Sequence, residues 1–326
     1  MRQITCRIRL SILIICSIVL QGSLGFSQAY NFDYLSIQKG LPQSQAFSLM
    51  FDSDQYAWIG TQGGGLCRYD GENYTYYTKS DSLISNRIFK TTQSDGSIWI
   101  GQKGGVTRLD DKGTFQKNYR LERNSIYVQD IIFYKGMHLF ATNNGVYQLQ
   151  NEVLEIIRDN PSINGANVFS FFLTNDNELW LCTNAGLLSF EDVFGKLSTA
   201  KGLSAAHVEC AVEFKDEWVL GTYEGGLNFY NRTSIYQKEV FSELDDKIIL
   251  SLFVSGENEL WIGTMNNGVY VYNSKDGVLK NFRTTNGLSG NHIKTIVADY
   301  WDNIWIGTSG GGVSVFQNSP FIKYNS

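Results

Sequence analysis

Apolar and polar residues alternate along this chain in short runs, and each run ends at Gly, Asn or Asp. In the last repeat the runs cover Leu279–Phe282, His292–Ala298, Ile304–Thr308 and Val313–Phe316. Alternation over such short lengths, with turn residues between the runs, predicts antiparallel β-strands. The unit is therefore a four-stranded sheet in which an outer strand precedes a loop and three further strands.

The same unit returns along the whole chain. Its most regular segment reads Trp-Ile-Gly-Thr followed by a glycine run, as at Trp305–Val313. The first residue of this segment is, in the seven copies, Trp58, Trp99, Leu139, Trp180, Val219, Trp261 and Trp305. These anchor positions are 39 to 44 residues apart, and a period near 40 with aromatic and glycine marks is typical of propellers. The sequence predicts an all-β fold, a seven-bladed β-propeller of four-stranded antiparallel blades.

The glycine runs predict tight hairpins, because Gly or Asn provides the positive φ that such turns need. No helical pattern follows them and no Lys-Ser/Thr pair ends them, which excludes a phosphate-binding loop. The anchor Trp is expected to pack between neighbouring blades. In the fifth repeat Trp218 lies one place before the anchor, so it either faces the opposite side of the sheet or marks a bulge.

Ring closure follows from a count of outer strands. Seven blades need seven, and the sequence offers eight: Phe32–Ile37, six between repeats, and Phe321–Tyr324. We predict that Phe32–Ile37 completes the last blade, because this pairing removes two exposed edges. Phe321–Tyr324 would then lead into a further segment; the opposite assignment is the alternative.

Composition fits one globular domain of this kind. The 326 residues are 43% hydrophobic and 18% charged, and the net charge of −5 gives no basic footprint for nucleic acid. It argues mildly against anionic ligands, although a local patch can oppose the net charge. After the amino-terminal segment three cysteines remain, Cys67, Cys182 and Cys210, and we expect buried free thiols instead of a disulfide framework.

The amino terminus predicts export. Arg2, Arg7 and Arg9 precede an apolar run from Leu10 to Leu20, and small residues follow at Gly25 and Ser27. This order is typical of a secretory signal peptide, so we assign residues 1–27 to it and residues 28–326 to the propeller. An uncleaved membrane anchor is the alternative, although the apolar run is short for a spanning helix.

The strand pair "WIGT…GGGV", the loop "NGLSGNHI" at Asn286–Ile293 and "KGLPQSQAF" at Lys39–Phe47 together resemble the two-component regulator propeller repeat. That family forms the exported sensor region of bacterial hybrid two-component systems and related histidine kinases. The resemblance runs from about Asn31 to the end. Repeats three, four and five depart most: Asn143-Asn144 and Asn184-Ala185 replace glycines, and the Gly-Leu-Ser loop is missing near Asn124–Val128 and Glu243–Ile248.

The resemblance implies a periplasmic propeller that senses a small-molecule or oligosaccharide ligand, with glycan fragments as the expected class, for a two-component signal transduction pathway. Family members continue into a further β-domain, a membrane helix and a kinase, which would be the partners of this region, on the outer face of the inner membrane. This chain carries no kinase or nucleotide-binding motif, so we expect no catalysis, no metal and no cofactor in it. It would be a fragment, a truncated reading frame or a standalone binder. A secreted protein-interaction module is the first alternative, and a propeller lyase or hydrolase the second.

Loop residues on one face of the ring are the candidate ligand site. In an up-and-down blade the loop into the first strand and the glycine hairpin share a face, and loops on rigid scaffolds often carry function. Amides, cations and aromatic rings there suit sugar hydroxyls. The candidates are Gln43, Gln62, Asn86, Arg87, Lys103, Tyr127, Asn143, Asn167, Asn184, His207, Tyr223, Glu224, Asn266, Asn291 and His292.

The sequence gives little support for calcium binding or for catalysis. Acidic turns such as Asp52–Asp54 and Asp299–Asp302 on the other face lack the Gly and Glu of a calcium loop and are expected to be Asx turns. No HExxH pair or Gly-x-Ser-x-Gly elbow is present. An enzyme would use His207 or His292, which occupy the same place in their repeats, with a rim acid such as Glu224.

Overall fold

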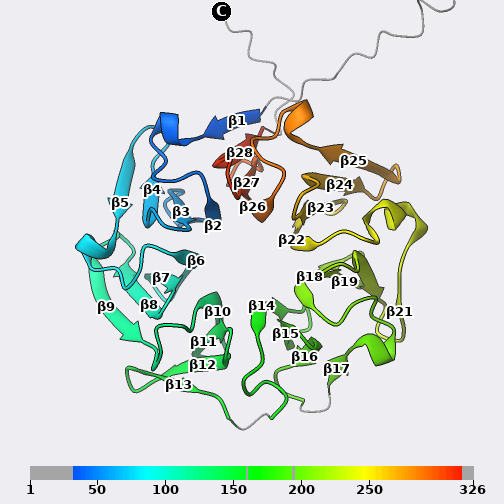
Figure 1. Ribbon diagram of the computed structural model, residues 1–326, viewed down its shortest axis with the longest axis horizontal. Helices are drawn as coiled ribbons and strands as arrows, with labels where there is room; N and C mark the ends of the chain where they lie inside the picture. Colours follow the sequence, from blue (N-terminus) through cyan, green and yellow to red (C-terminus); the bar gives the residue numbers. More distant parts are fainter. Residues whose placement is uncertain (1–31, 159–160, 193–194, 318–326) are drawn as a thin grey trace, which may run out of the picture. The chain divides into compact units, whose positions relative to one another are not determined.

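The computed structural model describes residues 32–158, 161–192 and 195–317. Within them the strands form seven four-stranded antiparallel sheets, which follow one another around a ring (Figure 1). The predicted signal peptide and the strand expected at Phe321–Tyr324 lie outside the described residues. No helix in the described part is long and apolar enough to cross a membrane.

Each blade has an inner strand beside the central channel and three strands that follow it outward. The inner strands are β2 (Ala46–Phe51), β6 (Ile88–Ser94), β10 (Val128–Tyr134), β14 (Val168–Leu173), β18 (Val208–Phe214), β22 (Ile249–Ser255) and β26 (Ile293–Ala298). The second strands, which carry the anchors, are β3 (Ala57–Thr61), β7 (Ser97–Gln102), β11 (Met137–Thr142), β15 (Leu179–Thr183), β19 (Glu217–Thr222), β23 (Glu259–Thr264) and β27 (Ile304–Thr308).

The third strands are β4 (Leu66–Tyr69), β8 (Gly105–Asp110), β12 (Gly145–Gln150), β16 (Gly186–Ser189), β20 (Leu227–Tyr230), β24 (Val269–Asn273) and β28 (Val313–Phe316). The outer strands are β5 (Tyr74–Tyr77), β9 (Phe115–Arg120), β13 (Val153–Ile156), β17 (Lys196–Leu197), β21 (Ile235–Tyr236), β25 (Val278–Phe282) and β1 (Phe32–Leu35). Short 3₁₀ turns follow several outer strands: η1 (Ile37–Lys39), η2 (Lys79–Asp81), η3 (Thr199–Lys201), η4 (Glu239–Leu244) and η5 (Thr284–Asn286).

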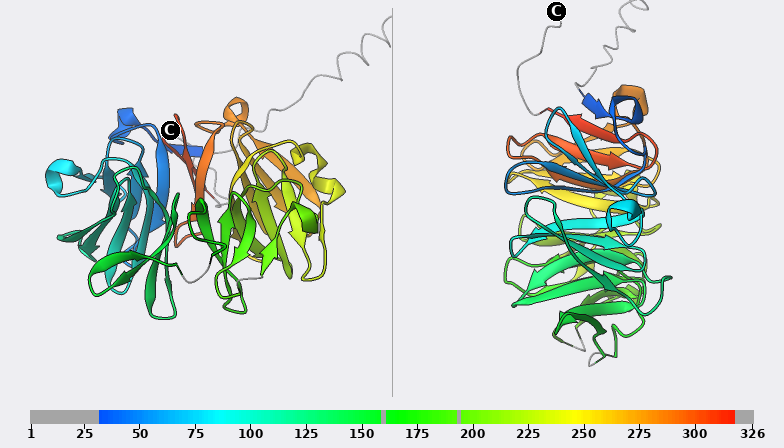
Figure 2. Two further views of the ribbon diagram at one scale, coloured as in Figure 1. Left: turned by 60° about the horizontal axis from the view of Figure 1, so that its bottom comes forward. Right: turned by 90° about the vertical axis from the view of Figure 1, so that its left-hand side faces the viewer.

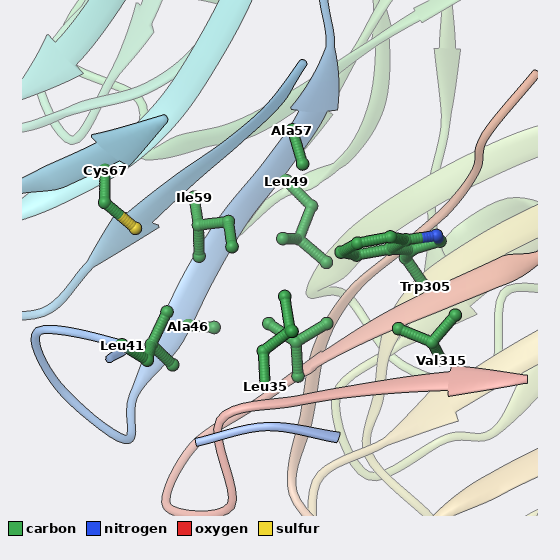
Figure 3. Close-up of a cluster of buried hydrophobic side chains, with 10 residues drawn as sticks. Leu35, Leu41, Ala46, Leu49, Ala57, Ile59, Cys67, Trp305 and Val315 are labelled. Carbon is green, nitrogen blue, oxygen red and sulfur yellow. The ribbon is translucent and has the colours of Figure 1, made fainter. Parts of the chain in front are cut away.

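The amino-terminal strand closes the ring, as predicted. The last sheet has the order β1-β28-β27-β26, with Phe32 opposite Phe316 and Leu35 opposite Val313. The strand is two residues shorter than expected, because the Lys39 and Leu41 N–H groups both donate to the Ser36 carbonyl and fold residues 37–39 into a 3₁₀ turn. That turn buries Leu41 in the cluster where blade 7 meets blade 1 (Figure 3).

The glycine inside Trp-Ile-Gly-Thr is required by blade-to-blade packing. A Cβ on Gly60 would lie 2.6 Å from Cγ2 of Ile88 in the next blade, far inside van der Waals contact. The hairpin glycines have a different cause: Gly268 has φ +74, and a Cβ there would lie 2.0 Å from the Phe282 carbonyl oxygen. The sequence predicted the second role, and the structure adds the first.

Trp218 faces the opposite side of its sheet from the anchor tryptophans. Its ring packs on Trp180 of the preceding blade, with centroids 5.0 Å apart, whereas Trp261 packs on Phe316 of the following blade. Of the two predicted possibilities, the reversed face is therefore the correct one.

The predicted buried thiols are confirmed for Cys67 and Cys182, which are free and buried; Cys210 is free and half-buried. Burial raises the pKa of the Cys67 and Cys182 thiols to about 12, so both stay protonated and act as small apolar groups.

Candidate functional site

The loops into the inner strands and the glycine hairpins are hydrogen-bonded to one another on one face of the ring. The Gln62 N–H donates to the Gln45 carbonyl at 3.2 Å, the Tyr223 N–H to His207 at 2.9 Å and the Ser309 N–H to His292 at 2.9 Å. We call this surface the rim face. Seen edge-on, the strands run across the thickness of the disc, so each turn falls on one of two faces (Figure 2).

A β-bulge interrupts every inner strand near its rim-face end. In blade 1 the pairing steps from Ala46↔Thr61 to Ser48↔Gly60, which leaves Phe47 as the extra residue. The seven residues placed in this way are Phe47, Phe89, Gln129, Phe169, Glu209, Leu250 and Lys294. All of them line the central channel, a cavity of about 300 Å³. We call this set the bulge ring; a bulge re-aims a side chain that the pleat would otherwise turn away.

Below the bulge ring, polar groups of the channel wall are hydrogen-bonded or ion-paired to one another across blades 1 to 4. Lys90 Nζ lies 2.8 Å from Asp130 Oδ1, and Asp130 Oδ2 accepts the Phe171 N–H at 2.8 Å. The Ser48 hydroxyl accepts the Thr91 N–H at 2.8 Å. These bonds tie neighbouring inner strands together, so this layer supports the mouth above it.

Aromatic rings extend the bulge ring outward at the mouth of the channel. His207 stacks on Phe169, with centroids 4.1 Å apart and planes 11° apart, and Tyr223 stacks on the other side of His207 at 5.0 Å and 14°. We call these three residues the mouth stack. Tyr127 packs on Phe89 at 5.4 Å. Aromatic rings that pack on one another therefore line part of the mouth.

Polar groups stand beside these rings. His207 Nε2 lies 3.2 Å from Glu209 Oε1, and the Gln129 amide donates to Asn167 Oδ1 at 2.8 Å. Burial lowers the pKa of Lys294, opposed by Glu209. Burial and then Lys294 lower the pKa of His292, whose Nε2 is buried without a hydrogen bond in the described structure. Hydrogen-bond donors and acceptors, including the charged side chains of Glu209 and Lys294, thus lie beside the aromatic rings.

The structure places the fifteen predicted site residues in different surroundings, and only some of them lie at the channel mouth. Those at the mouth are Tyr127, Asn167, His207, Tyr223 and His292. Amides that already accept a backbone N–H are Asn86, Asn143, Asn184 and Asn291. The exposed residues on this face are Arg87, Glu224 and Asn266. Gln43 and Gln62 each bury an unpaired side-chain oxygen, and Lys103 lines a separate pocket.

Sequence reasoning missed the bulge ring. Its seven residues look like ordinary strand positions, and only the register shift turns them into the channel. One signal was available: in each repeat the residue follows a small or β-branched residue, as in Ile88-Phe89 and Ile293-Lys294. The first of the two is fully buried, while the second varies in chemistry from blade to blade.

The acidic turns on the other face are Asx turns, as expected, in blades 1 and 7. Asp52 accepts the N–H groups of Asp54 and Tyr56 and the indole N–H of Trp58. Asp299 makes the equivalent bonds to Trp301, Asn303 and Trp305. The described residues contain no group of three or more metal-ligating side chains.

Comparisons with known proteins place this geometry in context. The family model for the two-component regulator propeller matches residues 287–310. A histidine kinase from Formosa agariphila is 26% identical over 318 residues, which is 92% of this chain and 20% of the kinase. This chain thus spans about a fifth of that relative's length.

Solved structures with the same fold include extracellular domains of two-component systems. The extracellular domain of a hybrid two-component system from B. thetaiotaomicron superposes with a TM-score of 0.72 and 25% identity, covering 90% of this chain and 40% of the other. A second such domain from the same organism gives 0.74 at 22% identity, covering 89% and 42%. A virginiamycin B lyase from Staphylococcus aureus shares the fold at 13% identity, with a TM-score of 0.66 over 87% of this chain and 97% of the lyase. This chain is therefore a seven-bladed propeller with a two-component regulator propeller match at residues 287–310, and it is similar to extracellular domains of hybrid two-component systems.

Proposed function

We propose that this chain is the ligand-sensing propeller of an exported, periplasmic two-component sensor. We further propose that it binds a glycan fragment at the mouth of its channel. The mouth stack carries the proposal: two aromatic faces and an imidazole are held in parallel on the rim face, beside Glu209 and Asn167. Stacked rings next to hydrogen-bonding groups suit a sugar, whose apolar C–H face lies on a ring while its hydroxyls reach polar atoms.

Rigid support favours the same assignment. The bulge ring lies on inner strands that each pair with the second strand of their blade, and the hairpin that carries Tyr223 is hydrogen-bonded to the His207 carbonyl. Binding groups held in place lose little conformational freedom when the ligand arrives, which increases affinity. The kinase and the membrane segment of a complete sensor would be partners outside this chain.

The direct test is a thermal-shift screen of the exported chain against neutral and acidic oligosaccharides, followed by calorimetry on the hits. Tyr223→Ala and His207→Ala are expected to weaken binding more than about tenfold, because truncating a central aromatic contact commonly costs 2 kcal/mol or more.

Trp301→Ala is the matched control. Its ring is 67% exposed on the turn at the face opposite the rim. If no glycan shifts the melting temperature, or if Trp301→Ala abolishes binding while Tyr223→Ala does not, the proposed site is wrong.

A second candidate function is a protein-interaction module. Tyr300 and Trp301 are 75% and 67% exposed and pack edge to face with centroids 5.9 Å apart. Exposed aromatic pairs are common at protein interfaces. Capture of a defined protein partner by the wild-type chain and not by a Tyr300→Ser, Trp301→Ser double variant, together with no glycan binding, would favour this function.

A further inference from the structure

A basic pocket lies on the rim face at blade 2. Its volume is about 240 Å³, and its lining residues are Lys79, Ile84, Ser85, Lys103, Arg120 and Asn124. Lys79 begins η2, Lys103 lies in the hairpin between β7 and β8, and Arg120 ends β9. Three segments that are separate in the sequence thus each bring one cation to the same hollow.

None of these three cations forms an ion pair within the described residues, whereas Lys90, Lys117 and Lys135 elsewhere in the chain do. Nearby carboxylates on this face are already engaged: Asp81 accepts the Thr78 N–H and hydroxyl at 3.0 and 2.8 Å. Glu122 accepts the Tyr147 hydroxyl at 2.5 Å. In a chain of net charge −5, three unpaired cations around one pocket form a local site that attracts an anion.

The pocket also offers neutral donors and a firm floor. Ser85 Oγ accepts the Arg87 N–H at 3.1 Å, which leaves its hydroxyl proton free to donate, and the Asn124 amide lies at the edge. Ile84 is buried beneath, against the position of Gly105. Cationic and neutral donors around a small hollow match the several acceptor oxygens of a sulfate, phosphate or carboxylate group.

One residue pair joins this pocket to the channel mouth. Lys103 forms an isolated β-bridge with Tyr127, and Tyr127 packs on Phe89 of the bulge ring. Tyr127, which precedes the inner strand of blade 3, thus connects the hairpin of Lys103 in blade 2 to the bulge ring.

We infer that the basic pocket binds an oxyanion carried by the ligand, so that the oligosaccharide recognised at the mouth is an acidic one, sulfated or uronic. This inference rests on the proposed function for the link to a sugar, and on the pocket alone for the anion. The aromatic rings of the mouth would hold the sugar rings, and the pocket would select for the anionic group.

Calorimetry with four probes tests the inference: a chondroitin sulfate hexasaccharide, its desulfated form, maltohexaose and inorganic sulfate. The test variant is Lys79→Gln, Lys103→Gln, Arg120→Gln. The control variant Lys196→Gln, Lys201→Gln, Lys280→Gln removes the same charge from exposed side chains outside the pocket.

We expect the acidic hexasaccharides to bind the wild type and the control alike. The test variant should bind them at least about tenfold more weakly, since it lacks all three cationic donors of the pocket. Added NaCl should weaken wild-type binding and have less effect on the test variant. Maltohexaose should bind all three more weakly than the acidic probes bind the wild type.

Equal binding of the acidic probes to test and control variants would overturn the inference, as would a preference for maltohexaose. Inorganic sulfate that binds as tightly as the hexasaccharide would assign the pocket to a free oxyanion and remove the link to a sugar. Tyr223→Ala separates the two proposals. If Tyr223→Ala binds the hexasaccharide normally and the test variant does not, the proposed binding site at the mouth is wrong and the pocket is supported. If the test variant binds normally and Tyr223→Ala does not, only the inference about the pocket is wrong.

Discussion

Where blade 7 meets blade 1, apolar side chains fill the contact, and where blade 4 meets blade 5, charged side chains cover it. At the first seam Trp305 from blade 7 shares one buried cluster with Leu35, Ala46 and Leu49, and its ring lies beside Leu49 (Figure 3). Its indole N–H is satisfied within its own blade by Asp299 at 3.0 Å. Nothing charged needs to cross that seam.

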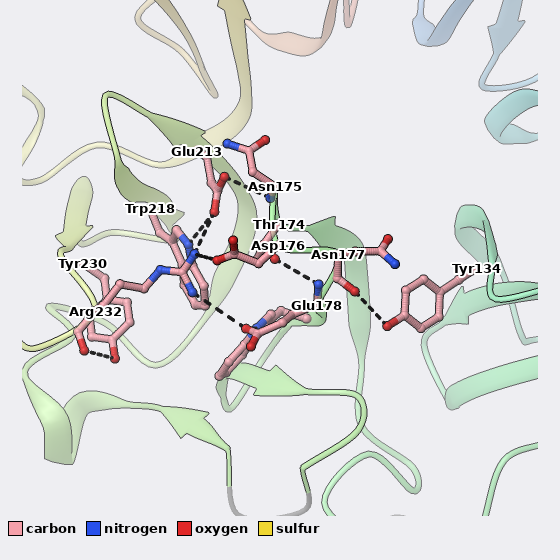
Figure 4. Close-up of polar contacts among 11 residues, drawn as sticks. Tyr134, Thr174, Asn175, Asp176, Asn177, Glu178, Glu213, Trp218, Tyr230 and Arg232 are labelled. Carbon is pink, nitrogen blue, oxygen red and sulfur yellow. Dashed lines mark hydrogen bonds and ion pairs between the residues drawn. The ribbon is translucent and has the colours of Figure 1, made fainter.

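The second seam receives a tryptophan from each side. Trp180 and Trp218 meet edge to face, and the Arg232 guanidinium lies 4.5 Å above the Trp218 ring. Arg232 also pairs with Asp176 of blade 4 at 2.7 Å and with Glu213 at 3.2 Å (Figure 4). Trp218 is only 1% exposed, and the Arg232 guanidinium over its ring contributes to that cover.

The comparison shows that neighbouring blades built from the same repeat can be held together by two kinds of interaction, apolar packing and an ion cluster. The two differ in strength. Apolar burial is insensitive to salt, whereas a half-exposed ion cluster contributes little and is screened. Substitutions at the two seams should therefore differ in size and in salt dependence.

The largest effect is expected at the closing seam. Trp305→Ala should lower the free energy of unfolding by about 3–5 kcal/mol, because it removes a buried indole and leaves a cavity. Urea denaturation followed by far-UV circular dichroism measures it. Trp301→Ala, four residues away but exposed, should change stability by less than about 0.5 kcal/mol; equal losses in the two variants would contradict the burial argument.

Gly307→Ala should cost less, roughly 1–3 kcal/mol, because overpacking forces the backbones apart. The added Cβ would lie 2.8 Å from the backbone oxygen of Ala46, which cannot rotate away. Gly63→Ala is the control, since its Cβ would meet only the Gln43 side chain at 3.6 Å. A stable Gly307→Ala variant with an unchanged denaturation midpoint would show that the blades can separate at no cost.

At the seam between blades 4 and 5, Arg232→Met should lower stability by only about 1 kcal/mol, from lost cation–π and ion-pair contacts at a partly exposed site. The loss should shrink in 0.5 M NaCl, as expected for screened charges. Denaturation of wild type and variant at low and high salt checks this. A difference that is large and independent of salt would mean that the aliphatic stem of Arg232, and not its charge, seals the seam.

The smallest effect concerns pH at the seam between blades 2 and 3. His138 packs on Trp99 with centroids 4.2 Å apart, and burial lowers its pKa below 6.5. The neutral imidazole is favoured in the fold, so its contribution is complete above pH 6.5 and is lost as pH falls through the folded pKa. His138→Phe should therefore flatten the fall in melting temperature between pH 7 and pH 5; parallel curves would remove His138 from the acid response.

Some of the site was readable in the chain and some was not. Tyr127, His207 and Tyr223 could be placed at a common face, because repeat spacing fixes which loops share an end of the blades. The amides of Asn143 and Asn291 looked equally suitable, yet their side-chain oxygens are already engaged. Asn143 accepts the backbone N–H of Tyr127, 16 residues away, and Asn291 accepts that of Thr284, 7 residues away. Which of the two roles an Asn takes depends on loop geometry that spacing does not encode.

By itself the sequence determined the number of blades, the four-stranded blade and the face that carries the loops, and it favoured one of two strands for closing the ring. All four follow from local periodicity and from the cost of an unpaired strand edge. Only the tertiary structure decided that a bulge aims Phe47, Phe169 and Lys294 into the channel, and that Lys79, Lys103 and Arg120 surround one pocket. Those arrangements join residues from separate strands and loops, and their distances exist only after the blades have packed against one another.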